Sequence, residues 1–318
     1  MHRSGLESLI VACPHPWRLP SYAAVDGFCR AVGQEPGYVL KRRPLESVAR
    51  TLCRLGVHGA LVRSPRQFCL VPMMGPVWRH AALWGIDHYL IMYAWDIWAD
   101  NIHLWQEPLK RYNIAGVITT SSDAASLLAS ALPTIPIRVV LEAATISEFG
   151  GSRPLVDRSI SVLEMGRRHE GLHLALRKGL PRATHRFQEA SRPIFPSRAD
   201  LLRALEDAVI SVCIPRSITH PDQAGPVCSV THRYFESMAA GAIVLGTAPP
   251  ELVELFGYDP VVGVDWRDPA RQVRSILADR ARYQPLVDRN LATVREKGDW
   301  TARRHEISAA VAEFREAL

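Results

Sequence analysis

The chain has 318 residues, of which 47% are hydrophobic and 22% are charged, and its formal net charge is +6 at pH 7. This composition is typical of a folded globular protein and excludes a disordered chain, because the apolar content suffices to build a core. No apolar run approaches the roughly 20 residues of a membrane-spanning helix. The N-terminus lacks a signal-peptide cleavage pattern, so we expect a cytoplasmic protein. The six cysteines have no CxxC spacing and are expected to be buried free thiols.

The first half of the chain alternates predicted strands and helices. The apolar run from Ser8 to Cys13 predicts a buried parallel strand, and a helix follows from about Tyr22 to Val32. Such an alternation is typical of an α/β domain with a mainly parallel sheet. Further strands are expected near residues 58–62, 68–72, 89–93, 115–119 and 137–141, and helices near 45–55, 77–84, 103–111 and 123–131.

Two places in this half carry candidate catalytic side chains. His15 lies in a proline-rich loop after the first strand, where open α/β sheets bind ligands; it could equally well cover the sheet edge. Asp96 and Asp100 follow the strand at 89–93 and alternate with Trp95 and Trp98. Because aromatic faces beside carboxylates suit a sugar ring, we expect both tryptophans to line a site, although most tryptophans fill cores. Either aspartate could serve as a general base or bind an acceptor.

A segment rich in glycine and proline, residues 146–157, predicts a linker between two domains. We therefore expect an N-terminal domain over 1–150, a second domain over 151–300, and a last helix over 301–318 that could cross back to the first domain. In the second half, strands are expected near 159–165, 184–188, 208–214, 242–245 and 260–264. Helices are expected to end near 178, to cover 200–207, 230–240, 269–279 and 283–297, and to begin after Pro249 and Pro250.

Basic side chains follow the expected strand ends of the second half. Free N–H groups and the positive end of the peptide dipole make a helix start, such as the one near residue 230, suitable for phosphate oxygens. An exposed arginine is usually a solvated charge, so the position after a strand carries this inference. The candidates for binding phosphate at these ends are Arg216, Ser229, Thr231 and Arg233.

The stretch ESMAAGAIVL (236–245), followed by PPELVE (249–254), resembles the donor-site segment of group 1 glycosyltransferases with the GT-B fold. The resemblance implies an α/β chain with two Rossmann-like domains that face each other across a cleft. It also implies that Glu236 binds the nucleotide ribose, and that Arg167 or Arg168 faces the donor pyrophosphate. Cys228 stands where many retaining members carry a second glutamate, so retaining and inverting reactions both stay open.

By this resemblance, the protein is a metal-independent hexosyltransferase. The nucleotide diphosphate sugar is its co-substrate and no separate cofactor is implied. The acceptor could be a glycan, a lipid-linked molecule or a small molecule, and peripheral contact with a membrane stays open.

Two alternatives are a nucleotide-sugar epimerase of similar fold and a catalytically inactive subunit that binds nucleotide sugars. The basic pI of about 9.1 raises a nucleic-acid module as a further alternative. However, the arginines form no basic stripe, so no nucleic-acid partner is expected.

Overall fold

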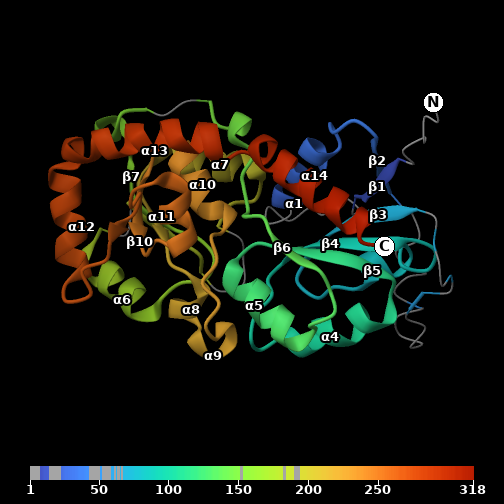
Figure 1. Cartoon of the computed structure of the whole chain (residues 1–318). Coiled ribbons are helices and arrows are strands. Elements are labelled where there is room, and N and C mark those ends of the chain that lie inside the picture. The colour runs from blue at the N-terminus through green and yellow to red at the C-terminus, as the bar shows by residue number, and fades with distance from the viewer. Residues whose placement is uncertain are drawn as a thin grey trace. The chain divides into compact units, whose positions relative to one another are not determined.

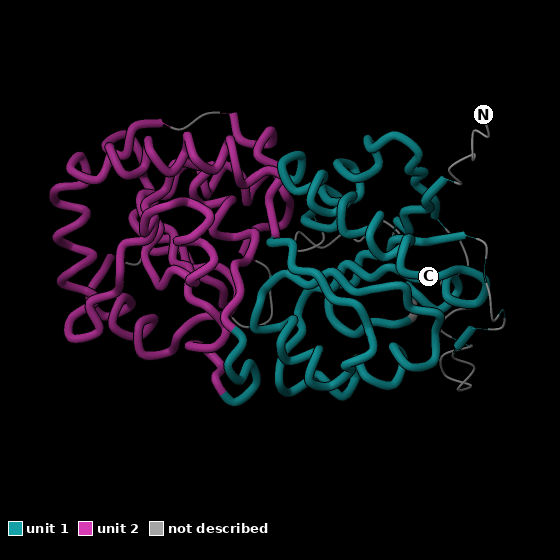
Figure 2. Tube along the Cα trace, in the orientation of Figure 1, with its two compact units in different colours: residues 1–141, 222–227, 300–318 teal, residues 142–221, 228–299 magenta. Residues whose placement is uncertain are grey.

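The computed structural model describes the chain except residues 1–7, 14–22, 43–50, 52–58, 61, 63–64, 66, 151–152, 182–183 and 190–193, and the side chain of Arg79. The chain forms two compact units (Figure 2). Unit 1 comprises residues 1–141, 222–227 and 300–318, and unit 2 comprises residues 142–221 and 228–299. The chain therefore leaves unit 1 after Leu141 and returns to it twice, for residues 222–227 and for its last helix.

Unit 1 is built on a six-stranded sheet in the order β2-β1-β3-β4-β5-β6, in which every strand pair is parallel (Figure 1). Its central strands are apolar and buried, as a parallel sheet with helices on both faces requires. The strands are β1 (Leu9–Ala12), β2 (Tyr38–Lys41), β3 (Phe68–Met74), β4 (Tyr89–Trp95), β5 (Ile114–Thr119) and β6 (Ile137–Val139).

The edge strand β2 differs from the expectation. We expected a strand near 58–62, but the described residues of that stretch, Gly59, Ala60 and Val62, lie outside any strand. The edge position is instead held by β2, which pairs with β1 and is largely exposed. An exposed edge strand has no apolar alternation, and the sequence pattern therefore gave no signal for it.

Helices cover both faces of this sheet (Figure 1). On one face, the ring of Trp300 lies 5.5 Å from Phe28 and 6.1 Å from Trp95, and all three side chains are buried. This aromatic cluster holds the C-terminal helix in unit 1. The described helices of unit 1 are α1 (Ala23–Val32), α3 (Arg79–Ala82), α4 (Ile102–Arg111), α5 (Ser122–Ala131) and α14 (Trp300–Glu316).

A short return of the chain, residues 222–227, also belongs to unit 1. The N–H groups of Ala99 and Asp100 donate to the carbonyls of Ala224 (3.4 Å) and Gln223 (3.0 Å). Ala224 is itself buried in the core of this unit. The loop after β4, which carries the two candidate aspartates, is thus held in part by residues that follow it by more than a hundred positions.

Unit 2 contains a five-stranded parallel sheet in the order β11-β10-β9-β7-β8. The strands are β7 (Ile160–Glu164), β8 (His185–Phe187), β9 (Ala208–Cys213), β10 (Ile243–Gly246) and β11 (Val262–Gly263). The helices are α6 (Glu170–Gly179), α7 (Arg198–Asp207), α8 (Arg216–Thr219), α9 (Pro221–Ala224, which continues into unit 1), α10 (His232–Ala239), α11 (Pro250–Phe256), α12 (Pro269–Ala278) and α13 (Gln284–Lys297), with 3-10 turns η2 (Ile146–Glu148), η3 (Leu155–Asp157) and η4 (Arg280–Tyr283).

Helix α10 packs its apolar side into the core of unit 2. Phe235, Met238 and Ala239 are fully buried with side chains from α7, α11 and α13. The hydroxyls of Ser237 and Ser211 form a hydrogen bond of 2.8 Å that ties α10 to β9. In the part of the chain that is described, no helix is long and apolar enough to span a bilayer.

The close approach of α14 to β5 gives a test of this packing. A Cβ atom on Gly116 would lie 2.5 Å from the Phe314 ring, so Gly116→Ala should destabilise the protein by about 1–3 kcal/mol through overpacking. Phe314→Ala should cost about 3–5 kcal/mol. In the Phe314→Ala background, Gly116→Ala should cost far less, because the ring it meets is gone. Urea unfolding of the four proteins measures this coupling, and simple additivity would contradict the packing.

Candidate functional site

The turn after β7 is the point at which several charged side chains of unit 2 meet. Gly166 has a φ of 71°, in the left-handed region that favours glycine. Helix α6 begins shortly after it, with the His169 ring accepting the N–H of Leu172 at 3.3 Å. Since β7, β9 and β10 are parallel neighbours or near neighbours, their carboxyl ends lie along one edge of the sheet, where α/β proteins bind ligands.

Arg233, in the first turn of α10, packs its guanidinium directly on this turn. A Cβ atom on Gly166 would lie 2.7 Å from Nη1 and 2.9 Å from Nη2 of Arg233, so a side chain at residue 166 would displace the guanidinium from its present position. Nη1 is buried and makes no hydrogen bond with any residue that the structure describes. A buried N–H without an acceptor is costly. The geometry therefore favours an anion that supplies the missing acceptor oxygen.

At the start of α10, the backbone N–H of His232 already has a hydrogen-bond acceptor within the protein. Thr231 is the N-cap but its side chain makes no capping hydrogen bond, and Ser229 is buried just before it. The N–H of His232 donates instead to Glu142 Oε2 at 2.8 Å, and the His232 ring lies 3.1 Å from the same oxygen. Burial lowers the pKa of His232, but the Glu142 hydrogen bond and the Glu236 charge hold that pKa above its usual value.

Arg168 lies on the same turn, and two nitrogens of its guanidinium contact neighbouring residues. Its Nη1 donates to the carbonyl of Gln188 at 3.2 Å and lies 3.3 Å from His173 Nε2, while its Nε lies 3.4 Å from Glu170. Nη2 has no hydrogen-bond partner among the described residues. One edge of the guanidinium is thus fixed and the other is open to a ligand.

The two other predicted arginines take different places. Arg167 is exposed on the turn beside Arg168. Arg216 begins the short helix α8, after the neighbouring strand β9, and is half-buried. The structure therefore brings Arg233 and Arg168 to one turn, with Arg167 next to them and Arg216 at the adjacent strand end.

Glu236 is already engaged in an ion pair that the sequence did not reveal. Its Oε1 accepts from Arg198 Nη1 at 2.6 Å, and Arg198 Nη2 also donates to Glu148 at 2.7 Å. Burial lowers the pKa of Arg198, but the carboxylates of Glu236 and Glu148 outweigh burial and hold that pKa above its usual value. Arg198 therefore stays charged. Glu236 is 5% exposed, and its Oε2 makes no hydrogen bond within the described part of the chain. One oxygen of this carboxylate is therefore held and one is available.

In unit 1, the candidate aspartates Asp96 and Asp100 differ in backbone conformation and in exposure. Asp96 follows β4 with a φ of 56°, a backbone conformation that is uncommon outside glycine. Its carbonyl accepts from Asn101 Nδ2 at 2.8 Å, and Asp100 is exposed. The prediction that Trp95 and Trp98 line a site is wrong: each is 2% exposed and part of the core, as most tryptophans are. His15 lies outside the described residues.

Comparison with known proteins identifies the architecture. No protein-family model matches the sequence, and no curated protein is similar to it. Solved structures, however, match nearly the whole chain. HepE from Anabaena, in complex with UDP and glucose, is 10% identical with a TM-score of 0.62, covering 96% of this chain and 100% of that one. Sucrose-phosphate synthase from Thermosynechococcus elongatus is 13% identical with a TM-score of 0.63, covering 98% and 100%.

An α-glucosyltransferase in complex with UDP and a DNA 13-mer is 10% identical, covers 95% of this chain and 99% of that one, and has a TM-score of 0.57. These proteins are GT-B glycosyltransferases, and the match extends over both sheets. The chain has the GT-B fold. The predicted fold class is therefore confirmed.

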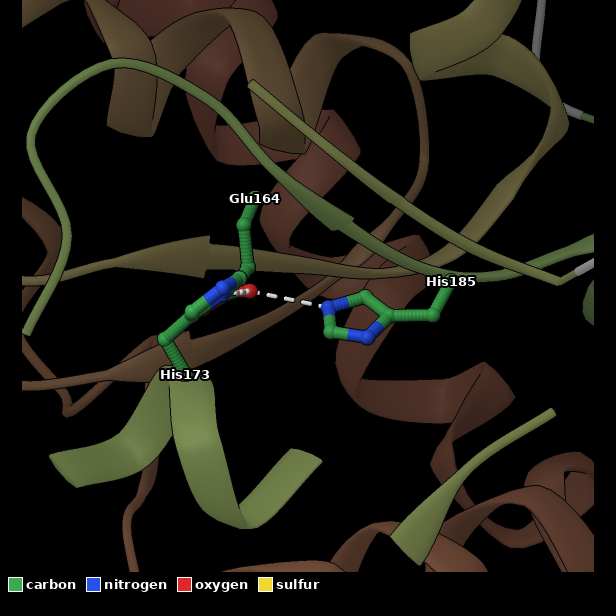
Figure 3. A group of neighbouring side chains, drawn as sticks. All are labelled: Glu164, His173 and His185. Carbon is green, nitrogen blue, oxygen red and sulfur yellow. Dashed lines mark hydrogen bonds and ion pairs between the residues drawn. The ribbon is translucent and has the colours of Figure 1, made fainter. Parts of the chain in front are cut away.

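Within this GT-B fold, one buried group of side chains has the chemistry of metal ligands. Glu164, His173 and His185 come from β7, α6 and β8, and their ligand atoms lie within 4.8 Å of one another (Figure 3). Sequence reasoning found no metal-binding pattern, because the three residues have no spacing typical of one. In the structure, Glu164 Oε2 accepts from His173 Nδ1 at 2.7 Å and from His185 Nε2 at 2.8 Å.

Gly166 and Gly257 form a matched pair for testing whether the contact of Arg233 with the turn at Gly166 supports anion binding. Both have left-handed backbones, with φ of 71° and 76°, but only Gly166 meets Arg233, whereas nothing lies within 4 Å of a Cβ on Gly257. Each change to alanine should destabilise the protein by about 1–2 kcal/mol through backbone strain. Only Gly166→Ala should weaken the binding of inorganic pyrophosphate in calorimetry, because it displaces the guanidinium. Equal pyrophosphate affinity in both variants would contradict this role of the turn.

Proposed function

We propose that the protein is a glycosyltransferase that moves a hexose-like sugar from a nucleotide diphosphate sugar to an acceptor. The observation that carries the proposal is the guanidinium of Arg233, which is packed on Gly166 with a buried nitrogen that lacks a partner among the described residues. A diphosphate supplies the anionic oxygens that such a nitrogen needs. The proposal is supported by the GT-B fold and by HepE, whose structures hold UDP or UDP-glucose.

In this proposal, the arginines act on the leaving group. As the glycosidic bond breaks, negative charge develops on the diphosphate. Arg233 and the open edge of Arg168 would stabilise it, with Arg167 or Arg216 beside them. Fixed positive charge aimed at developing negative charge is usually the largest catalytic contribution. Because the protein's own cations supply that charge, we propose that transfer needs no metal ion.

Glu236 would orient the donor rather than carry out chemistry. With Oε1 held by Arg198, Oε2 can accept a hydroxyl of the nucleotide ribose. A hydrogen bond to a charged acceptor contributes about 1.5–3 kcal/mol. Ser229 and Thr231, which precede α10, would offer further hydroxyl groups to the donor. The acceptor class, whether glycan, lipid-linked or small molecule, belongs to the same proposal and is left open within it.

For an inverting reaction, we propose Asp96 as the general base, with Asp100 as the second candidate. The strained backbone of Asp96 supports this order, because such conformations persist where the surrounding structure imposes them, often at functional positions. Asp100 is exposed and has an ordinary backbone. His15 stays a third candidate.

The proposal is tested with UDP, uridine and radiolabelled UDP-sugars. Arg233→Met should weaken UDP binding by about 10-fold to 100-fold and leave uridine binding unchanged, since only UDP carries the diphosphate. Arg271→Met, an exposed position on α12, is the control and should alter neither affinity. Equal losses for both ligands would refute the diphosphate role. Isomerised sugar would identify an epimerase instead, and binding without turnover would identify an inactive subunit.

A second prediction concerns the base. Asp96→Asn keeps a side chain that tolerates the left-handed backbone, and Asp96→Gly removes the strain as well as the carboxylate. If Asp96 is the base, both variants should lose turnover by about a hundredfold or more while UDP affinity stays unchanged. Asp100→Asn serves as the comparison. Normal turnover in both Asp96 variants would exclude Asp96, and the anomeric configuration of the product, read by NMR, then distinguishes a retaining reaction from another base.

A further inference from the structure

The last residue of β7, Glu164, is a carboxylate that is 4% exposed. His173 and His185, exposed by only 1% and 3%, donate to the same oxygen, Oε2 (Figure 3). Burial alone raises the pKa of Glu164, but these two hydrogen bonds outweigh it and hold the pKa below its usual value. Glu164 is therefore a buried anion, and a buried anion must be paired.

The hydrogen bonds of Glu164 continue through His173 to Arg168, which is exposed. Since His173 Nδ1 donates to Glu164, the neutral ring carries its lone pair on Nε2. Arg168 Nη1 lies 3.3 Å from that Nε2 and can donate only to a lone pair. A single neutral tautomer of His173 thus satisfies both Glu164 and Arg168.

The same geometry disfavours a metal ion at this cluster. A metal bound by His173 Nδ1 would take the lone pair of that nitrogen, and the ring proton would then sit on Nε2. That proton would face the N–H of Arg168 Nη1, so two donors would oppose each other at 3.3 Å. The distances of 2.7 Å and 2.8 Å to Glu164 are also those of hydrogen bonds.

We propose that Glu164 and His173 are positioning residues that orient Arg168 toward the donor diphosphate. This inference rests on the proposed function. Arg168 Nη1 is held by the His173 ring and by the carbonyl of Gln188, and its Nε lies 3.4 Å from Glu170, whereas Nη2 has no partner among the described residues. His185 fixes Glu164 from the neighbouring strand. The fixed guanidinium loses less freedom when it binds a phosphate, which strengthens binding.

Two substitutions of His173 separate positioning from folding. Asparagine places an N–H near the position of Nδ1, so His173→Asn keeps the hydrogen bond to Glu164 and loses the one to Arg168. Glutamine places an amide near Nε2, so His173→Gln can accept from Arg168. We expect His173→Asn to weaken UDP binding about fivefold, because Arg168 is then less well oriented before the phosphate binds. His173→Gln should stay within about twofold of the unmodified protein, and uridine binding should not change in either variant.

The decisive comparison repeats His173→Asn in an Arg168→Met background. If His173 acts through Arg168, the second change should have no further effect on UDP affinity. An equal loss in both backgrounds, or an equal loss for uridine, would overturn the positioning role while UDP binding itself upholds the proposed function. If the unmodified protein does not bind UDP, the proposed function fails, and the positioning role fails with it.

A readout that needs no ligand tests the hydrogen-bond chain itself. Nitrogen NMR of labelled histidine should show His173 protonated at Nδ1 and unprotonated at Nε2. The Nε2 signal should shift in Arg168→Met but not in Arg271→Met. Metal analysis should find less than stoichiometric transition metal in the purified protein. Stoichiometric zinc that disappears in His173→Asn and His185→Asn would overturn the inference in favour of a metal site.

Discussion

The contact between Arg233 and Gly166 determines how the rest of the candidate site is arranged. The guanidinium lies where a side chain on residue 166 would stand, and Gly166 has a left-handed backbone that favours glycine. The contact fixes the first turn of α10 relative to the sheet, and it leaves one buried nitrogen without an acceptor among the described residues. A buried nitrogen without an acceptor costs stability unless a ligand oxygen accepts its hydrogen bond. This contact is therefore the basis of the functional proposal.

Around this contact, three buried carboxylates of unit 2 are paired within the same unit. Glu142 binds the start of α10, Glu164 binds two histidines, and Glu236 binds Arg198. Each carboxylate is at most 6% exposed and each has a partner. These pairs do not mainly supply stability, because desolvation offsets much of their attraction. They fix the direction of the helices and side chains around Arg233 and Arg168.

Unit 1 contributes rigidity of another kind. The aromatic cluster of Phe28, Tyr93, Trp95 and Trp300 joins α1, β4 and α14, so the strand that leads to Asp96 is anchored by the C-terminal helix. Residues 222–227 hold the loop after Asp96 through hydrogen bonds to Ala99 and Asp100. A left-handed aspartate needs such support, because its backbone conformation is unfavourable by itself.

The sequence by itself determined most of the strands and helices, the buried face of α10 and the position of arginines after strand ends, but not the exposed edge strand β2. These features follow from local periodicity and from turn chemistry, which a linear pattern contains. It also indicated the donor segment around Glu236 through a resemblance.

Only the tertiary structure decided which charges pair. Glu236 is 38 residues from Arg198, and His232 is 90 residues from Glu142, distances along the chain at which no pattern specifies a partner. The same reason explains the errors. Trp95 and Trp98 follow a strand end beside carboxylates, as binding residues do, but packing against Phe28, Trp300 and the core under α4 buries them. Burial depends on what lies opposite a residue in space, and the order of the chain does not contain that information.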